Sequence, residues 1–490
     1  MLDRRSVLTG GALLAGAMLA GKTLPAAGAA DLRADIDILR RAYMQLHPGL
    51  YRYATETQIA ARLDALETAF AKGPTLAQSY LLLSRFLASI RCGHSYANFY
   101  NQSDKVPAEL FAGRNKLPFH FSWIGERMIV TRNQSNDARL QPGTEVLEID
   151  DRPSASILRD LMPLIRADGA NDDKRRALLE VSGVDRFETF DVFFGLLFPP
   201  QNAMFKLRVR APGAAAAQTI EAKALDLAER RAAMPPEGDD ARPLWTLTYP
   251  AARVALMTMP TWAVYNSKWK WQAFLDDAFA EIERRNTRGL IVDLRDNEGG
   301  EDCGNEIVAR LIDKDLSLES YERRVRYRKT PADLDPYLDT WDPSFKTLGE
   351  GATDIGGGFY RLEPEPGGED GTRVRAKGPR FNGQVLVLTS AQNSSATFQF
   401  AQCMQSNRLG RLMGGATGGN QRGINGGAFF FLRLPASGLE VDLPLIGRFS
   451  PTPKPDAGLT PDILVAQTAE DIAAGRNRVL ETAISLLARA

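Results

Sequence analysis

The segment from Gly383 to Ala401 constrains the fold of this 490-residue chain more than any other. A run of β-branched residues and leucine, 384–389, is followed by the polar stretch 390–395 and by a helical pattern from Ala396. A buried strand, a tight turn and a helix in this order are typical of an α/β architecture. The turn also leaves a serine at a helix start, where unpaired N–H groups can stabilise an oxyanion.

A second strand ends in a pair of glycines. The apolar run Leu290–Leu294 is followed by a polar loop that closes on Gly299 and Gly300. Glycine lets backbone N–H groups approach a substrate carbonyl because no Cβ stands in the way. We therefore expect Gly299 and Gly300, with the N–H of Ala396, to be the oxyanion donors. The alternative is an ordinary strand-to-helix turn.

The serine turn offers two candidate nucleophiles, Ser395 and its neighbour Ser394. Ser395 directly precedes Ala-Thr-Phe, with which the helical pattern begins. Serine is also a common N-cap, so either residue could serve only to begin the helix. On the strand, turn and helix alone, the two interpretations are equally supported.

A serine nucleophile needs a base, and His94 can supply it. The chain has only three histidines, His47, His94 and His120, and His94 follows a helical segment in the sequence Cys-Gly-His-Ser. Imidazole titrates near neutral pH, whereas a lysine base must first be strongly desolvated. An isolated histidine beside a glycine is more often a structural loop residue, so this assignment depends on the other motifs.

In this order the histidine, the glycine pair and the serine turn resemble the tail-specific, carboxyl-terminal processing and tricorn-type serine peptidases. The segments Leu46–Tyr51 and Gly458–Ile463 extend the resemblance along most of the chain after residue 31. It implies a multidomain α/β protein in which a crotonase-like α/β catalytic core follows a small helical domain and a PDZ-like α+β module.

Within that family the tricorn-like branch takes its base from an upstream histidine, whereas the bacterial tail-specific branch pairs serine with lysine. Asn420 stands about where that lysine would fall, and asparagine cannot be a general base. The resemblance therefore implies Ser395 with His94. It also points to Asp456, shortly before the closing segment, as the acidic residue that supports the histidine.

The expected domain organisation follows from these motifs and from shifts in pattern. Breaker-rich residues Pro235–Asp240 indicate a linker, and residues after Asp313 lack clear periodicity, which indicates a lid or partial disorder. We expect the following division: signal peptide 1–30, helical domain 31–112, PDZ-like module 115–215, and catalytic core 240–490 with an insertion at 313–380.

The composition argues against several classes of binding partner. With 60 basic and 60 acidic residues the chain offers no electrostatic case for binding nucleic acid. Three cysteines without metal-ligand spacing, and few histidines, argue against a metal centre, so we expect no metal and no cofactor. Cys92 and Cys303 flank the two loop motifs, so either they form a disulfide or all three cysteines are buried thiols.

The expected function is an exported serine peptidase that cleaves a peptide or protein substrate through an acyl-enzyme. One rival is a catalytically silent member of the same fold that binds lipid or peptide, as retinoid-binding relatives do. The other is an acyl-thioester enzyme of the crotonase type, whose glycine loops also hold oxyanions. The serine, the histidine and the glycine pair together favour the peptidase.

The first 30 residues predict export. A pair of arginines, Arg4 and Arg5, precedes a Gly- and Ala-rich run, and Ala27–Ala29 offers small residues for a signal peptidase. We expect Tat export to the periplasm or beyond, with no membrane span in the mature protein. The alternatives are an ordinary secretory signal and an uncleaved anchor.

The export prediction can be tested with Arg4→Lys and Arg5→Lys in one precursor. Because the twin arginine is read directly by the Tat machinery, the variant should stay in the cytoplasm. Immunoblots of cell fractions give the measurement. Mature protein outside the inner membrane at the wild-type level would contradict Tat export.

Overall fold

The computed structural model describes residues 32–489, except residues 233, 235–243, 266, 319–320 and 364–372. The predicted signal peptide at 1–30 and the predicted linker at Pro235–Asp240 lie outside the described residues. Within the described part, no helix is both long and apolar enough to cross a bilayer.

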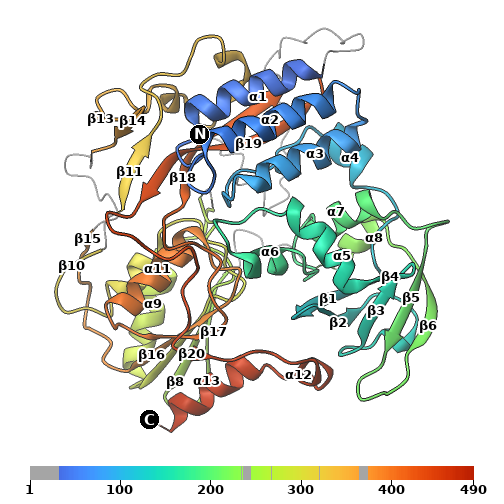
Figure 1. The fold of residues 1–490 in the computed structure, drawn as a ribbon. Coiled ribbons are helices and arrows are strands. Elements are labelled where there is room, and N and C mark those ends of the chain that lie inside the picture. Colours follow the sequence, from blue (N-terminus) through green and yellow to red (C-terminus); the bar gives the residue numbers. More distant parts are fainter. Residues whose placement is uncertain are drawn as a thin grey trace.

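The chain begins with a layer of helices (Figure 1). The second and third helices each begin with a capping box, in which a threonine and the glutamine three residues later bond each other's backbone N–H. Helix α3 ends at Ser89, and Arg91 turns the chain with a φ of 60° into the loop that carries His94. The helices are α1 (Arg33–Leu46), α2 (Glu56–Phe70), α3 (Leu76–Ser89) and the short α4 (Lys105–Leu110).

An antiparallel sheet follows, largely within the region predicted as a PDZ-like α+β module. Its order is β1-β2-β3-β5-β6, with β4 paired to β3, and helices α5 and α7 lie beside it (Figure 1). The strands are β1 (Phe119–Ile124), β2 (Arg127–Asn133), β3 (Glu145–Ile149), β4 (Arg152–Pro153), β5 (Met204–Arg210) and β6 (Gln218–Lys223). The helices are α5 (Ser154–Leu161), α6 (Asp172–Leu178), α7 (Thr189–Leu197) and α8 (Leu227–Ala232).

Strands and helices alternate after residue 250, and the strands form a second sheet, of order β20-β17-β16-β9-β8-β7. Every pair is parallel except β7 with β8. The strands are β7 (Thr246–Ala251), β8 (Val254–Thr258), β9 (Gly289–Asp293), β16 (Gln384–Thr389), β17 (Arg411–Gly414) and β20 (Ile463–Leu464).

Helices cover both faces of this parallel sheet. On one face α9 (Trp271–Arg284), α10 (Cys303–Val308) and α11 (Ser395–Ser406) pack against the strands, and on the other lies α13 (Arg478–Ala488). All five residues of β9 are therefore buried. A strand buried on both faces has a largely apolar sequence, and here Leu290–Val292 is an unbroken apolar run before Asp293.

A third sheet, of order β12-β18-β19-β11-β14-β13, joins the late chain to the first helices. Its centre is the hairpin of β18 (Asn425–Leu434) and β19 (Leu439–Phe449). The Tyr43 hydroxyl of α1 donates to the carbonyl of Asp442 at 2.8 Å, and the Asp35 carboxylate accepts the N–H groups of Ala436 and Ser437. The hairpin thus packs under α1 (Figure 1).

The insertion 313–380 is more regular than the sequence predicts. Its described residues form β10 (Leu316–Ser317), β11 (Glu322–Val325), β12 (Leu338–Asp339), β13 (Thr353–Gly356), β14 (Phe359–Arg361) and β15 (Arg373–Val374). These segments are ordered, whereas the lid role stays a prediction. Strand β11 pairs with β19, and Arg324 stacks over Phe449 at 4.6 Å, so partners distant in sequence supply an order that local periodicity does not signal.

The closing helix is also divided. The sequence predicts one helix over Ala469–Ala488, but the structure has α12 (Ala469–Ala473) and α13, separated by Gly475 with a φ of 63°. Asn477 begins the second helix by accepting the N–H of Leu480. A positive φ is easily adopted by glycine, so Gly475 ends the first helix.

Glu188 is a buried carboxyl group beside the antiparallel sheet, and its titration predicts how stability depends on pH. It is 4% exposed, and it accepts the N–H of Gly183 at 2.6 Å. Burial first, and then the charges of Asp185 and Asp191, raise the pKa of Glu188. Such a carboxyl stabilises the fold below its unfolded pKa of about 4.3, and this contribution is lost as the pH rises through the folded value.

We therefore expect Glu188→Gln, which keeps the acceptor oxygen, to raise Tm relative to wild type more at pH 9 than at pH 5. Thermal unfolding at both pH values gives the measurement, and Glu221→Gln on exposed β6 is the control. An equal difference at both pH values would contradict the assignment.

Candidate active site

The two predicted loops leave one edge of the parallel sheet. Strands β9 and β16 pair in parallel, with Leu388 opposite Asp293. Their carboxyl ends therefore lie side by side, and the loop that holds Gly299 starts next to the turn that holds Ser395. Such an edge is where ligands bind in open α/β sheets.

Asn393 builds the serine turn. Its side chain is fully buried, and its Nδ2 donates to the carbonyls of Leu294 and Asn297, while its Oδ1 accepts the N–H of Ser390 at 2.8 Å. These bonds fasten the turn after β16 to the loop after β9. Sequence patterns do not predict this role, because it depends on a loop almost 100 residues away.

The two candidate serines differ in conformation and in hydrogen bonding. The Ser394 hydroxyl is buried and donates to the carbonyl of Glu298 at 3.0 Å. Ser395 is half-buried, has a φ of 51°, and its hydroxyl has no hydrogen-bond partner among the described residues. A non-glycine residue in the left-handed region is strained, and such strain gathers at functional sites.

The glycine pair packs directly against this turn. A Cβ on Gly299 would lie 2.9 Å from the Cβ of Ser395, and one on Gly300 would lie 2.1 Å from the carbonyl oxygen of Trp262. Both residues have positive φ, 112° and 142°. The glycine loop thus lies against the serine turn, and any side chain here would push the loop away from the serine.

The side chain of Asn297 accepts a hydrogen bond from one of the predicted oxyanion donors, Gly299. Its Oδ1 accepts the N–H of Gly299 at 2.8 Å and the hydroxyl of Thr397 at 2.7 Å, and its Nδ2 donates to Met259. The N–H of Gly300 has no acceptor within the described residues. Ala396 lies in the first turn of α11, where N–H groups lack partners inside the helix.

His94, in the loop after α3, packs against the first residues of β18. Its ring is 5.8 Å from that of Phe429, and a Cβ on Gly426 would lie 3.8 Å from it. His94 is half-buried, whereas His47 and His120 are 0% and 2% exposed. Burial lowers the pKa of His47 to about 3 and that of His120 to about 4, so both are neutral core residues.

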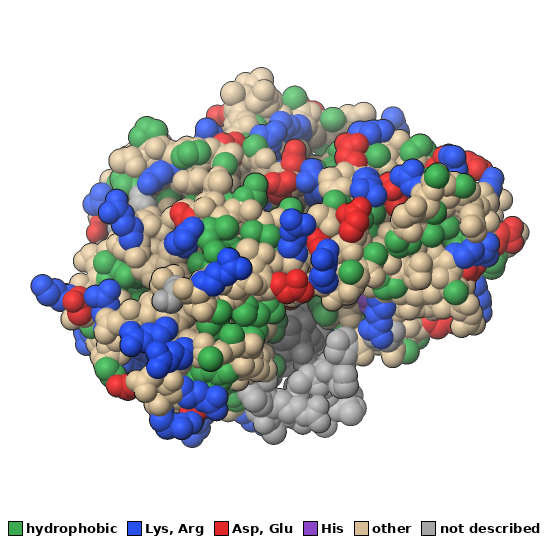
Figure 2. Space-filling model, turned by 90° about the horizontal axis from the view of Figure 1, so that it is seen from below, with side chains coloured by type: hydrophobic (Ala, Val, Ile, Leu, Met, Phe, Trp, Pro, Cys, Tyr) green, Lys and Arg blue, Asp and Glu red, His purple; other side chains and the backbone are tan. Residues whose placement is uncertain are grey.

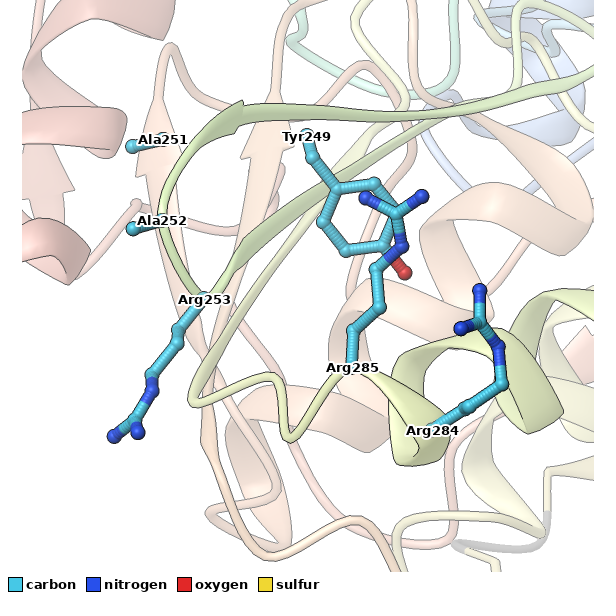
Figure 3. A pocket seen from close by; sticks show the side chains of 6 residues that line it. All are labelled: Tyr249, Ala251, Ala252, Arg253, Arg284 and Arg285. Carbon is cyan, nitrogen blue, oxygen red and sulfur yellow. The ribbon is translucent and has the colours of Figure 1, made fainter.

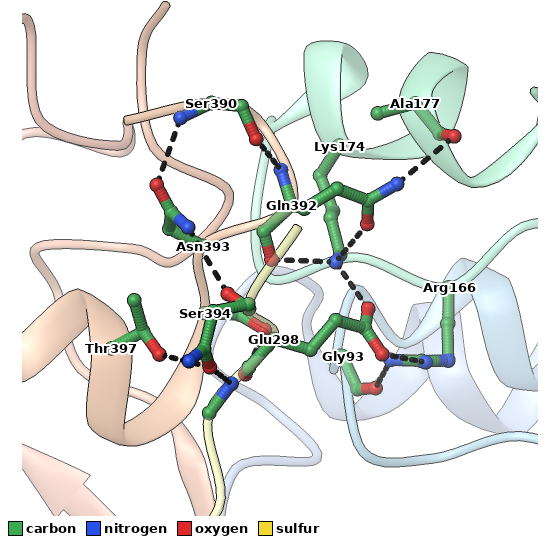
Figure 4. A network of polar contacts seen from close by, with 12 residues as sticks. Gly93, Arg166, Lys174, Ala177, Glu298, Ser390, Gln392, Asn393, Ser394 and Thr397 are labelled. Atoms are coloured by element: carbon green, nitrogen blue, oxygen red, sulfur yellow. Dashed lines mark hydrogen bonds and ion pairs between the residues drawn. The ribbon is translucent and has the colours of Figure 1, made fainter. Parts of the chain in front are cut away.

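A polar network joins the three loops, and sequence reasoning missed most of its members (Figure 4). Arg166 donates to the carbonyl of Gly93 at 2.8 Å and pairs with the Glu298 carboxylate at 3.3 Å. Lys174 pairs with the same carboxylate and donates to the Gln392 carbonyl at 2.9 Å. The network therefore brings the residue before His94 to the residue before Gly299.

Asp456 lies in a second group of contacts. Its Oδ1 accepts the Asn420 amide at 2.7 Å and the N–H of Ala170 at 3.0 Å. Asn420 also donates to the carbonyl of Asp168 at 3.3 Å, and the Asp168 carboxylate accepts the N–H of Gly93 at 2.9 Å. A chain of hydrogen bonds thus leads from Asp456 to the residue before His94.

The cysteines are all free thiols, so the alternative of a bridge between Cys92 and Cys303 is wrong. Cys92 packs in the core shared by the first helices and accepts a bond from Asn425 at 3.3 Å, whereas Cys303 packs under the parallel sheet. The loop of His94 and the glycine loop are therefore each anchored in a different hydrophobic core. Among the described residues, no three His, Cys, Asp or Glu side chains gather as a metal site.

A hollow of about 550 Å³ lies at the opposite edge of the parallel sheet (Figure 3). Arg253, just before β8, lines it together with Arg284 and with Arg285, which stacks on Tyr249 at 4.1 Å. None of the residues that line it is a serine, a cysteine or a histidine. Elsewhere, the face seen from below mixes basic, acidic and hydrophobic side chains (Figure 2).

Comparison with known proteins gives a family match and a similar fold. Residues 253–465 match peptidase family S41. Two solved structures of mature CPAF, one complexed with lactacystin, share the fold at a TM-score of 0.62 and 15% identity. The similarity covers 94% of this chain and 98% of CPAF in the complex, or 97% without lactacystin. No curated protein matches the sequence.

The strain at Ser395 can be measured through stability. Because glycine adopts a positive φ without the steric cost, Ser395→Gly should be about 1 kcal/mol more stable than Ser395→Ala. Urea unfolding of both variants gives the difference. At Ser394, whose φ is −136°, the glycine variant should not be the more stable one. A more stable alanine variant at residue 395 would contradict the strained conformation.

Proposed function

We propose that Ser395 is the nucleophile and His94 the general base of this serine-type peptidase, whose residues 253–465 match peptidase family S41. One observation carries the proposal. Ser395 stands at the start of α11 with a left-handed backbone and an unengaged hydroxyl, directly against the glycine loop. Its neighbour Ser394 is buried and already bonded.

The proposed reaction is acyl transfer to serine. His94 accepts the hydroxyl proton as Ser395 attacks the carbonyl of the scissile bond, and the carbonyl oxygen becomes an oxyanion. His94 then protonates the leaving amine, and the acyl-enzyme forms. Water, deprotonated by the same histidine, hydrolyses the acyl-enzyme and restores Ser395. The substrate is a peptide or protein.

The N–H groups of Gly300 and Ala396 are the oxyanion donors in this proposal. Gly299 donates to Asn297 instead, so its contribution is to let the loop approach the serine without a side chain. Removing one such donor typically costs 10²–10³-fold in kcat. Asn297 acts indirectly, because it ties the glycine loop to α11 through Thr397.

Two observations favour histidine over lysine as the base. Asn420, near the position of the family's lysine, is fully buried and bonded to Asp456 and Asp168. Lys174, the lysine of the adjoining network, is held by Glu298 and Gln392. An ammonium group that donates to both of these residues has no lone pair with which to accept the serine proton.

Asp456 has a supporting role in the proposal. Through Asn420 and Asp168 it would hold the backbone that precedes His94 and so limit the orientation of the imidazole. An orienting group of this kind stabilises the imidazolium that forms during catalysis. The assignment differs from a direct triad, because the contacts of Asp456 reach His94 through other residues.

Three finer assignments also belong to the proposal. The twin arginine supports Tat export to the periplasm or beyond. The antiparallel sheet with α5 supports a PDZ-like module at 115–215. The parallel sheet flanked by helices supports a crotonase-like catalytic core within 240–490.

The proposal predicts that serine and histidine act as a unit. Because neither is useful without the other, Ser395→Ala, His94→Ala and the double variant should each lose about 10⁴-fold or more, by similar amounts. Hydrolysis of fluorescein-labelled casein gives the measurement.

Ser394→Ala is the matched control in the same turn and should lose far less activity. Asn420→Ala should also be much milder than either main variant. Wild-type activity in purified Ser395→Ala would contradict the proposed nucleophile.

A further inference from the structure

The carboxylate of Glu298 is shared by two cations that come from one segment of the antiparallel unit (Figure 4). Arg166 Nη2 lies 3.3 Å from Oε2, and Lys174 Nζ pairs with Oε1. Lys174 is 2% exposed and Arg166 is 20% exposed, whereas Glu298 itself is 44% exposed. The lysine therefore carries its charge inside the protein, next to the only carboxylate with which it pairs in the described residues.

Each cation continues to a different catalytic loop. Arg166 donates to the carbonyl of Gly93, and its guanidinium lies 4.5 Å over the ring of Tyr96. It therefore contacts the chain on both sides of His94. Lys174 donates to the carbonyl and to the side-chain oxygen of Gln392, at 2.9 and 3.0 Å, in the turn that leads to Ser395.

Glu298 also belongs to the third loop. It immediately precedes Gly299, and its carbonyl accepts the Ser394 hydroxyl at 3.0 Å. One residue thus connects the base loop, the oxyanion loop and the nucleophile turn, through contacts within three residues of each proposed catalytic group.

We propose that Glu298 is a positioning residue that fixes the relative placement of His94, the glycine loop and Ser395 through Arg166 and Lys174. The inference rests on the proposed roles of Ser395 and His94. It assigns to Glu298 no contact with the substrate. Its effect is on alignment, and a misplacement of about 1 Å in an active site can cost 10²-fold in rate.

Electrostatics support an ionised carboxylate at this position. The partial loss of water around its carboxylate would by itself raise the pKa of Glu298, but the charges of Lys174 and Arg166 lower it to about 2. Burial lowers the pKa of Lys174, and Glu298 opposes this effect. Without the carboxylate, a buried ammonium group would remain unpaired, which is strongly unfavourable. The lysine would then have to leave Gln392 or lose its proton.

The matched variants are Glu298→Gln, which removes the charge and keeps the shape, and Glu301→Gln, which removes a carboxylate from the same loop outside the network. Kinetics on fluorescein-labelled casein should show kcat reduced by about 10–100-fold in Glu298→Gln, with KM changed less than about twofold. Glu301→Gln should keep the wild-type kcat.

The double variant Lys174→Met, Glu298→Gln removes the buried charge together with its partner. Replacing a buried ion pair in this way is often tolerated by the fold, so this protein supplies the kinetics if Glu298→Gln does not fold. Its kcat should still be reduced at least about tenfold. The loss should be smaller than the product of the two single losses, because the residues act through one interaction.

A merely structural role would lower Tm and leave kcat unchanged well below the transition. Wild-type kcat in folded Glu298→Gln, or in the double variant, would overturn the proposal. Ser395→Ala assayed beside them separates the two levels. If Ser395→Ala is active, the proposed nucleophile is wrong; if it is inactive while Glu298→Gln keeps full kcat, only the positioning role is wrong.

Discussion

The parallel pairing of β9 with β16 is the constraint on which the site depends. It places the ends of two strands, almost 100 residues apart in sequence, side by side at one edge of the sheet. A shift of register by one residue would move one loop by about 3.3 Å relative to the other. The contact between Gly299 and Ser395, where even a methyl group would clash, could not survive such a shift.

Burial of both strands fixes this register. A one-residue slip would exchange the two faces of β16, so that Val387 would face α13 and Leu388 would face α11. The same burial helps to hold Ser395 in its left-handed conformation, because the turn is anchored by β16 on one side and by α11 on the other. A strained residue persists only where its surroundings determine it so fully.

The sequence patterns predicted the parts of the candidate site that a single short segment of the chain builds by itself. The strand, turn and helix around Ser395, the glycine pair and the loop of His94 after α3 all lie where the patterns indicate. Asn393, Asn297, Arg166 and Lys174 were not predicted, because their roles come from partners far along the chain. The same reason explains the ordered insertion, whose β11 pairs with β19. The loop motifs likewise suggested a disulfide between Cys92 and Cys303, but these cysteines are free thiols in separate cores.

The central claim is that Ser395 is the nucleophile activated by His94. The most direct measurement is peptide mapping by mass spectrometry after reaction of the mature protein with a fluorophosphonate, which phosphonylates activated serines. The account predicts one modified residue, Ser395, and a much slower reaction in His94→Ala. Modification of Ser394 instead, or labelling of Ser395 at the wild-type rate without His94, would contradict it.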